Sequence, residues 1–145
     1  MPSLNFTHRL VRIALSGQKD KSGESMYSHA VRVHGNLVNP TPAEEHAALL
    51  HDIVEDTDCT FYDLSMFGYS NEVVGMVRLL THDKAELTYR QYLQKIMASG
   101  SLGAVRIKLA DNKDNSDPRR HVKLDPEDSA FLLKRYAMAR TILQP

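Results

Sequence analysis

The sequence has no tryptophan, one cysteine and few aromatic residues, and it has no excess of either charge. Its 145 residues carry 18 Lys+Arg against 18 Asp+Glu. A lone cysteine, Cys59, cannot form an internal disulfide, which favours a reducing, cytoplasmic compartment. The balanced charge argues against a protein that binds long nucleic acids or membrane surfaces, because such proteins need a basic excess to neutralise phosphates.

Long apolar runs are also missing. His8, Arg9 and Arg12 interrupt the apolar residues of the first fifteen positions, so we expect neither a signal peptide nor a membrane span there. The length and a hydrophobic content of 42% suit one globular domain, residues 1–145, that closes its core without disulfides. The sequence leaves the oligomeric state open.

Sustained alternation of apolar and polar residues, the signature of half-buried strands, is absent from the chain. Apolar residues recur instead at helical spacing, which predicts an all-α fold. Thr41, Pro42 and Glu44 form a typical helix start, with a capping residue followed by proline at the first helical position. The pattern predicts helices at 4–16, 26–38, 43–56, 60–66, 71–80, 88–100, 102–111 and 125–143.

The helix predicted at 43–56 is apolar around its circumference but ends in the densest cluster of titratable residues in the chain, namely His51, Asp52, Glu55 and Asp56. Carboxylates at this end of a helix oppose its dipole, so a positive group should lie nearby. An imidazole with a hard carboxylate suits a first-row divalent cation. The alternative is a solvated acidic helix end with an incidental histidine, but the apolar flanks make uncompensated charges costly there and favour the metal.

Two ligands do not complete a metal site, so further ligands must come from elsewhere. His29 lies in the second predicted helix, and Asp111 ends an apolar run. Taken alone, His29 is more often a hydrogen-bonded structural histidine and Asp111 a carboxylate at a helix end. Their meaning depends on the pattern as a whole.

The pattern resembles the HD superfamily of metal-dependent phosphohydrolases. It is most similar to the alarmone-hydrolase branch, the Rel/SpoT hydrolase domains and small alarmone hydrolases that remove the 3′-pyrophosphate from (p)ppGpp. The run 47–57, Ala-Ala-Leu-Leu-His-Asp-Ile-Val-Glu-Asp-Thr, resembles the extended HD motif of that branch nearly residue for residue. Weaker matches are the Gly-Gln loop at 17–24 with the following His29, Phe67-Gly68, Leu80-Thr81, and Lys108-Leu109-Ala110-Asp111 with Asn115.

The resemblance implies a compact helical bundle that binds one divalent metal ion, most simply Mn²⁺, between its helices. It implies His29, His51, Asp52 and Asp111 as the metal ligands. Glu55 and Asp56 would then position and deprotonate the attacking water. Substrate contacts are implied for Lys19, Lys113, Thr81 and Asn115, whereas Lys108 can instead pair with a ligand carboxylate.

The sequence departs from the alarmone-hydrolase branch at several positions that would contact the substrate. Gln18 and Lys19 stand where that branch has Arg-Lys, and the residues between Asp111 and Asn115 also differ. The expected function is hydrolysis of a small phosphorylated nucleotide, with (p)ppGpp or an adenine analogue as the leading substrate. The alternatives are a nucleotide phosphomonoesterase, such as a nucleotidase or an NADPH phosphatase, and a non-catalytic nucleotide sensor.

Overall fold

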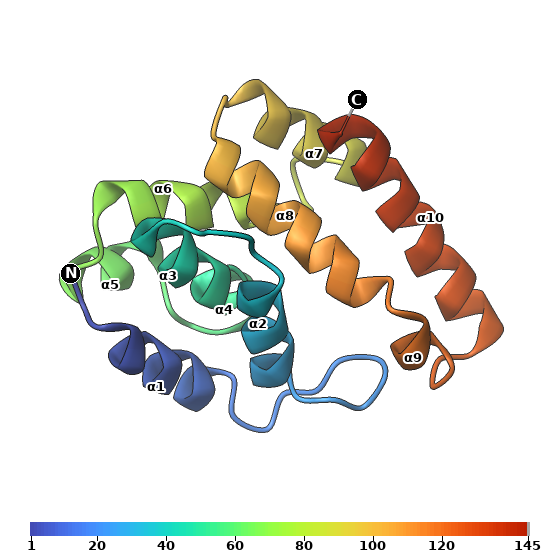
Figure 1. Cartoon of the computed structure of the whole chain (residues 1–145), viewed down its shortest axis with the longest axis horizontal. Helices are drawn as coiled ribbons and strands as arrows, with labels where there is room; N and C mark the ends of the chain where they lie inside the picture. The colour runs from blue at the N-terminus through green and yellow to red at the C-terminus, as the bar shows by residue number, and fades with distance from the viewer. Residues whose placement is uncertain (145) are drawn as a thin grey trace.

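A computed structural model describes residues 1–144 of the chain, and these residues fold into helices without a strand. The prediction of an all-α fold is therefore confirmed. The loop after the first helix contains one isolated antiparallel bridge, between Lys19 and Ser25. The helices, drawn in Figure 1, are α1 (Leu4–Ala14), α2 (Met26–Gly35), α3 (Pro42–Leu50), α4 (Ile53–Asp56), α5 (Phe61–Met66), α6 (Asn71–Leu80), α7 (Tyr89–Ala98), α8 (Leu102–Asn115), α9 (Pro118–His121) and α10 (Pro126–Leu143).

The helices begin at the small hydroxyl and acidic residues that the sequence places before them. The Thr41 hydroxyl accepts a hydrogen bond from the Glu44 backbone N–H, and Pro42 opens α3 as predicted. Ser70 caps α6 in the same way, and Thr88 forms a reciprocal capping box with Gln91. Each cap satisfies a backbone N–H that has no partner inside the helix, which fixes where the helix starts.

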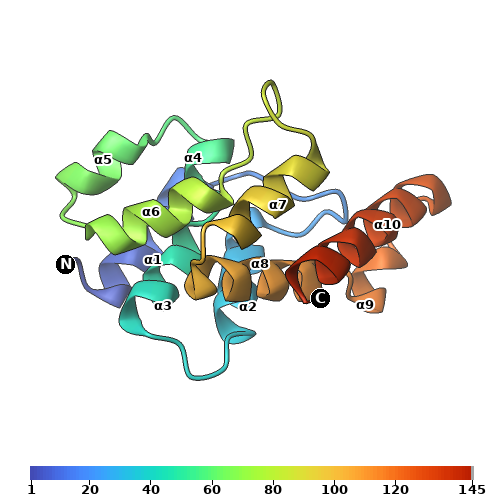
Figure 2. The same ribbon diagram turned by 90° about the horizontal axis from the view of Figure 1, so that it is seen from above.

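The core surrounds α3, which lies between α1, α2, α6 and α8 (Figure 2). Four consecutive residues of α3 are at most 1% exposed, in agreement with the apolar circumference of the helix predicted there. Because α1, α2, α6 and α8 all pack against this helix, α3 holds them in place relative to one another. The four residues are Ala47, Ala48, Leu49 and Leu50.

The predicted continuous helix 43–56 is wrong in one respect, because it breaks at His51 and Asp52. Asp52 has φ −102° and ψ −2°, and α4 begins only after it. The His51 Nδ1 atom lies 2.7 Å from the Ala48 carbonyl oxygen. That oxygen is the one that an uninterrupted helix would offer to the Asp52 N–H, so the imidazole competes with the helix for it. The break changes the direction of the chain at His51 and Asp52, the HD pair.

Other boundaries also differ from the predicted ones. Helix α2 ends three residues early, at Gly35, before Asn39 adopts a positive φ of 48° ahead of Pro40. Helix α8 continues four residues past Asp111 and ends at Asn115. The short helix α9, opened by Asp117 and Pro118, was not predicted. Among the described residues no helix is both long and apolar enough to cross a membrane.

Replacing Ile107 by alanine is expected to lower the free energy of unfolding by about 2–5 kcal/mol, because a fully buried side chain on α8 would leave a cavity. The matched control is Leu102→Ala on the same helix, where the side chain is 77% exposed. Urea unfolding of both variants measures the difference. A loss of stability as large in the Leu102 variant as in the Ile107 variant would contradict the packing described here.

Candidate metal centre and active site

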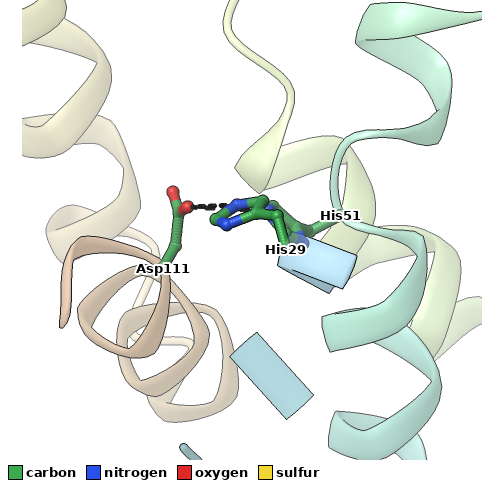
Figure 3. A group of neighbouring side chains, drawn as sticks. All are labelled: His29, His51 and Asp111. Atoms are coloured by element: carbon green, nitrogen blue, oxygen red, sulfur yellow. Dashed lines mark ion pairs between the residues drawn. The ribbon is translucent and has the colours of Figure 1, made fainter. Parts of the chain in front are cut away.

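Three parts of the fold bring the predicted metal ligands together. His29 comes from α2, His51 and Asp52 from the break between α3 and α4, and Asp111 from α8. One potential ligand atom each from His29, His51 and Asp111 lies within 4.8 Å of the other two, and all three residues are buried. Figure 3 shows the two imidazoles beside the Asp111 carboxylate.

The distances at the centre of this group are short. His29 Nε2 lies 2.9 Å from Asp111 Oδ1 and 3.7 Å from Asp52 Oδ2. His51 Nε2 lies 3.1 Å from Asp52 Oδ2 and 3.7 Å from Asp111 Oδ1. Asp52 therefore lies beside both histidines, whereas only His29, His51 and Asp111 offer ligand atoms that all lie within 4.8 Å of one another in the described part of the chain.

The donor atoms suit a divalent cation. His51 is 2% exposed, and because its Nδ1 can donate to the Ala48 carbonyl, its Nε2 is free to carry a lone pair. This Nε2 atom is buried, and among the described residues it has no hydrogen-bond partner of good geometry. A buried acceptor without a donor is costly unless a cation meets it. Two imidazole nitrogens with two carboxylates form a donor set that first-row divalent metals prefer.

The electrostatics of the group favour charged carboxylates. Burial alone would raise the pKa of Asp111, but the charge of Lys108 and the hydrogen bond from His29 hold it well below its ordinary value. Lys108 Nζ lies 2.7 Å from Asp111 Oδ2, so the alternative role considered for Lys108 is the one it takes. Burial opposes the positive charge of His29, yet its hydrogen bonds to Asp111 and Asp114 raise its pKa to about 9. The carboxylates thus attract positive charge strongly, whether a proton or a metal ion.

His29, Asp52 and Asp111 line a cavity of about 220 Å³, whereas His51 is buried and is not among its lining residues. Glu55 and Asp56, predicted as the catalytic pair, both line this cavity together with Asp52 and Asp111. The Glu55 Oε1 atom accepts a hydrogen bond of 2.7 Å from the His82 backbone N–H, which fixes that carboxylate. Burial and the charges of Asp52 and Glu55 raise the pKa of Asp56 to about 6.

The predicted substrate contacts are only partly brought to the cavity. Asn115 lines it and donates from Nδ2 to Asp111 Oδ1 at 2.8 Å. Lys19 is exposed and lines a neighbouring hollow of about 290 Å³ that shares Asn115 with the first cavity. Thr81 lies between two lining residues, and its hydroxyl donates to the Val77 carbonyl.

Lys113, another predicted substrate contact, is not brought to the cavity. It is two residues from Asp111 on α8, and a rotation of about 200° places its side chain on the other side of that helix. There it is exposed and lines hollows with residues such as Asn36 and Ser116. In this conformation Lys113 does not line the cavity with the HD residues, so its contact with a substrate stays a prediction.

Several residues of the site were not predicted from the sequence. Arg135 and Tyr136 of α10 line the cavity, and the Arg135 guanidinium lies 3.9 Å from the centre of the Tyr89 ring. Asp114 lies 2.6 Å from His29 Nδ1. Asp114 follows Asp111 by three residues, and this helical spacing was the signal that could have placed it near the site. No local pattern marks Arg135 and Tyr136, because only tertiary packing brings α10 back to the site.

Comparisons with known proteins agree with this geometry. No family model matches the chain. The guanosine-3′,5′-bis(diphosphate) 3′-pyrophosphohydrolase MESH1 of Drosophila melanogaster is 48% identical over 117 residues, which cover 76% of this chain and 62% of the relative. The bifunctional (p)ppGpp synthase/hydrolase SpoT of Escherichia coli is 34% identical over 121 residues, 77% of this chain and 17% of SpoT. The chain is thus similar to SpoT-type hydrolases over about three quarters of its length.

A solved structure is also similar to this chain. It is described as a metazoan orthologue of SpoT that hydrolyses ppGpp and plays a role in starvation responses. The two structures superpose with a TM-score of 0.83 and 26% sequence identity, over 99% of this chain and 88% of the other. The matched segments span less than two thirds of the length of the Drosophila relative and a small part of SpoT.

Proposed function

We propose that this protein is a metal-dependent phosphohydrolase that removes the 3′-pyrophosphate from a (p)ppGpp-type alarmone. The observation that carries the proposal is the group of close ligand atoms from His29, His51 and Asp111, with Asp52 3.1 Å from His51. This group adjoins a cavity that Glu55 and Asp56 also line. The named activities of the Drosophila and E. coli relatives agree with it.

In this proposal His29, His51, Asp52 and Asp111 hold one divalent cation, and Mn²⁺ is the ion we expect. When bound, such a cation lowers the pKa of water and screens the charge of phosphoryl oxygens. The two histidines contribute neutral nitrogens and the two aspartates negative charge, so the group neutralises a divalent ion in a buried place. Lys108 balances part of the Asp111 charge from the other side.

The carboxylate pair of α4 supplies the proton acceptor. Asp56 is half-buried, and its raised pKa makes it a stronger base than an ordinary aspartate. Glu55 is held by the His82 backbone N–H and can orient the water that Asp56 deprotonates. Attack of that water on the phosphorus next to the 3′ oxygen breaks the P–O3′ bond. The 3′ oxygen takes up a proton, and pyrophosphate leaves.

Cationic and polar groups around the cavity would bind the rest of the nucleotide. Asn115 can hydrogen-bond the ribose or a phosphate without adding negative charge, and Lys19 lies in the adjoining hollow. Lys84 and Arg135 line the cavity and provide positive charge. A highly charged small nucleotide needs several such partners, because each phosphate oxygen that loses water must gain a donor.

Hydrolysis is expected to fall about tenfold for each pH unit below about 6, since Asp56 accepts a proton only when it is ionised. Burial and the neighbouring Asp52 and Glu55 charges raise its pKa to about 6, although His51 and Lys84 act in the opposite direction. The test is the pH profile of kcat between pH 5 and 8 at saturating Mn²⁺. A rate that does not change across this range would contradict the role of Asp56.

The experiment that tests the proposal is turnover of a substrate panel with Mn²⁺ and with a chelator. We expect ppGpp or pppGpp to give pyrophosphate and the corresponding 5′-nucleotide, and ppApp to report on the tolerance for adenine. Phosphate release from NADPH or from nucleoside monophosphates in place of pyrophosphate would indicate a phosphomonoesterase. Tight binding of ppGpp without turnover would indicate a sensor, and either result would overturn the proposal.

We also propose a domain organisation and a cellular compartment. We infer that residues 1–145 form a single HD domain, which the shared core around α3 supports. The half-buried, unpaired Cys59 supports a reducing, cytoplasmic compartment. The partner is a small phosphorylated nucleotide. The chain lacks the excess of positive charge that would favour binding of a long nucleic acid or a membrane.

A further inference from the structure

Asp114 is a buried carboxylate that lies beside the metal centre but faces away from it. Its Oδ2 atom lies 2.6 Å from His29 Nδ1, the ring nitrogen opposite the one that faces Asp111. The residue is 4% exposed and is outside the group of converging ligand atoms. It therefore contacts His29 on the side of the ring that faces away from Asp111.

The two histidines of the centre find different acceptors for the same ring nitrogen. His51 Nδ1 lies 2.7 Å from the backbone carbonyl of Ala48, whereas His29 Nδ1 lies next to the Asp114 side chain. In both rings this leaves Nε2 directed at the ligand group. A neutral imidazole that offers a lone pair from Nε2 must carry its proton on Nδ1, and the acceptor at Nδ1 decides that tautomer.

Two arginines hold the Asp114 carboxylate in place. Arg32 of α2 donates from Nε to Oδ1 at 2.7 Å, and Arg120 of α9 donates from Nη1 to Oδ2 at 2.7 Å. Charged donors thus fix the carboxylate at both oxygens, as a rigid hydrogen-bond acceptor must be.

Arg120 extends this arrangement to the loop between α1 and α2. It pairs through Nη2 with Asp20, a residue of that loop, and Asp20 also lines the cavity. Figure 1 shows the loop reaching toward α9. The Asp20 carboxylate in turn accepts hydrogen bonds from the Ser22 and Glu24 backbone N–H groups, so the loop is tied to the same arginine.

We propose that Asp114 is a positioning residue for the metal centre, which sets the tautomer and the ring orientation of His29 while Arg32 and Arg120 hold its carboxylate. The inference rests on the proposed metal-dependent function. The sequence alone gives Asp114 no role, and Asp114 lies at a position where the chain departs from the alarmone-hydrolase pattern. Carboxylates that orient a ligating histidine raise its basicity and its affinity for metal.

The test is Mn²⁺ binding by the Asp114→Asn variant of the full chain, followed through the electron paramagnetic resonance signal of free Mn²⁺. Asparagine keeps the size of the side chain but removes its charge. We expect the Mn²⁺ dissociation constant to rise about 10- to 100-fold relative to the wild type. The visible spectrum of the Co²⁺-loaded variant should also change, because the orientation of one ligand is no longer fixed.

The matched control is Asp128→Asn, which removes the same charge from a half-buried residue of α10 that pairs with Lys21 at 3.6 Å. Its Mn²⁺ affinity should equal that of the wild type. Unfolding curves of both metal-free variants separate a structural role from a positioning one. An Asp114→Asn protein that is folded and binds Mn²⁺ as tightly as the wild type would overturn the inference.

A second variant covers the case in which Asp114→Asn does not fold. Arg32→Gln removes the donor to Asp114 Oδ1 from a partly exposed side chain. We expect it to bind Mn²⁺ more weakly than the Asp128→Asn control, and equal affinity would overturn the inference.

The wild type, measured in parallel, separates this inference from the proposed function. If the wild type binds Mn²⁺ and hydrolyses ppGpp while Asp114→Asn is unchanged, only the role of Asp114 fails. If the wild type binds Mn²⁺ without hydrolysing any nucleotide and Asp114→Asn binds it more weakly, only the proposed activity fails. A wild type that binds no Mn²⁺ overturns both.

Discussion

Replacement of His51 by alanine is expected to abolish Mn²⁺ binding and to reduce ppGpp hydrolysis by roughly a thousandfold or more. The variant removes a buried nitrogen that faces Asp52 and Asp111 and has no other partner of good geometry among residues 1–144. Loss of the cation removes several kcal/mol of charge stabilisation, and each 1.36 kcal/mol corresponds to about a factor of ten in rate.

The control for this prediction is His34→Ala. His34 lies on α2, five residues after His29, and its Nε2 atom is 3.2 Å from Glu45 on the neighbouring helix α3. This variant should keep both Mn²⁺ binding and activity. Circular dichroism of the His51 variant establishes that it is folded. A folded His51→Ala protein with unchanged Mn²⁺ affinity would show that the ligand assignment is wrong.

Replacement of Asp56 by alanine is expected to leave Mn²⁺ binding intact while reducing kcat by about 10²- to 10⁴-fold, the usual contribution of a general base. Asp56 lines the cavity beside Asp52 but is not one of the converging ligand atoms. Its pKa of about 6 is suited to accepting a proton near neutral pH. Calorimetric titration with Mn²⁺ and single-turnover hydrolysis of ppGpp measure the two properties separately.

Asp58→Asn provides the comparison for Asp56, because it changes an exposed carboxylate two residues further along the chain. Its activity should match that of the wild type. If Asp56→Ala instead loses Mn²⁺, Asp56 belongs to the ligand set. If the variant keeps full activity at saturating Mn²⁺, another group accepts the proton.

The sequence predicted the fold well where local chemistry decides it. Ser70 and Thr88 start α6 and α7 because their hydroxyl groups satisfy backbone N–H groups at those positions. The apolar run at 47–50 predicted the buried helix α3 because few other environments accommodate it. The break at His51 could not be predicted in this way, since it depends on a side chain competing for the Ala48 carbonyl.

In the candidate site, too, local spacing predicted some residue positions, whereas tertiary packing decided others. His29, His51 and Asp111 come together because they lie on elements that pack against one another, and helical spacing put Lys108 on the face of Asp111. Lys113 lies away from the cavity because the helix predicted to end at Asp111 continues to Asn115, and two positions along a helix turn a side chain to the other side. Arg135 was missed because α10 returns to the cavity through tertiary packing, which leaves no local pattern in the sequence.

The central claim is that one metal centre drives removal of the 3′-pyrophosphate. The most direct measurement is hydrolysis of ppGpp in ¹⁸O-labelled water while Mn²⁺ is added in steps to the metal-free protein. The account predicts equal amounts of pyrophosphate and GDP, the label in the pyrophosphate, and a rate that saturates at one Mn²⁺ per chain and disappears with chelator. Hydrolysis that is unaffected by the chelator, or no release of pyrophosphate at any Mn²⁺ concentration, would contradict it.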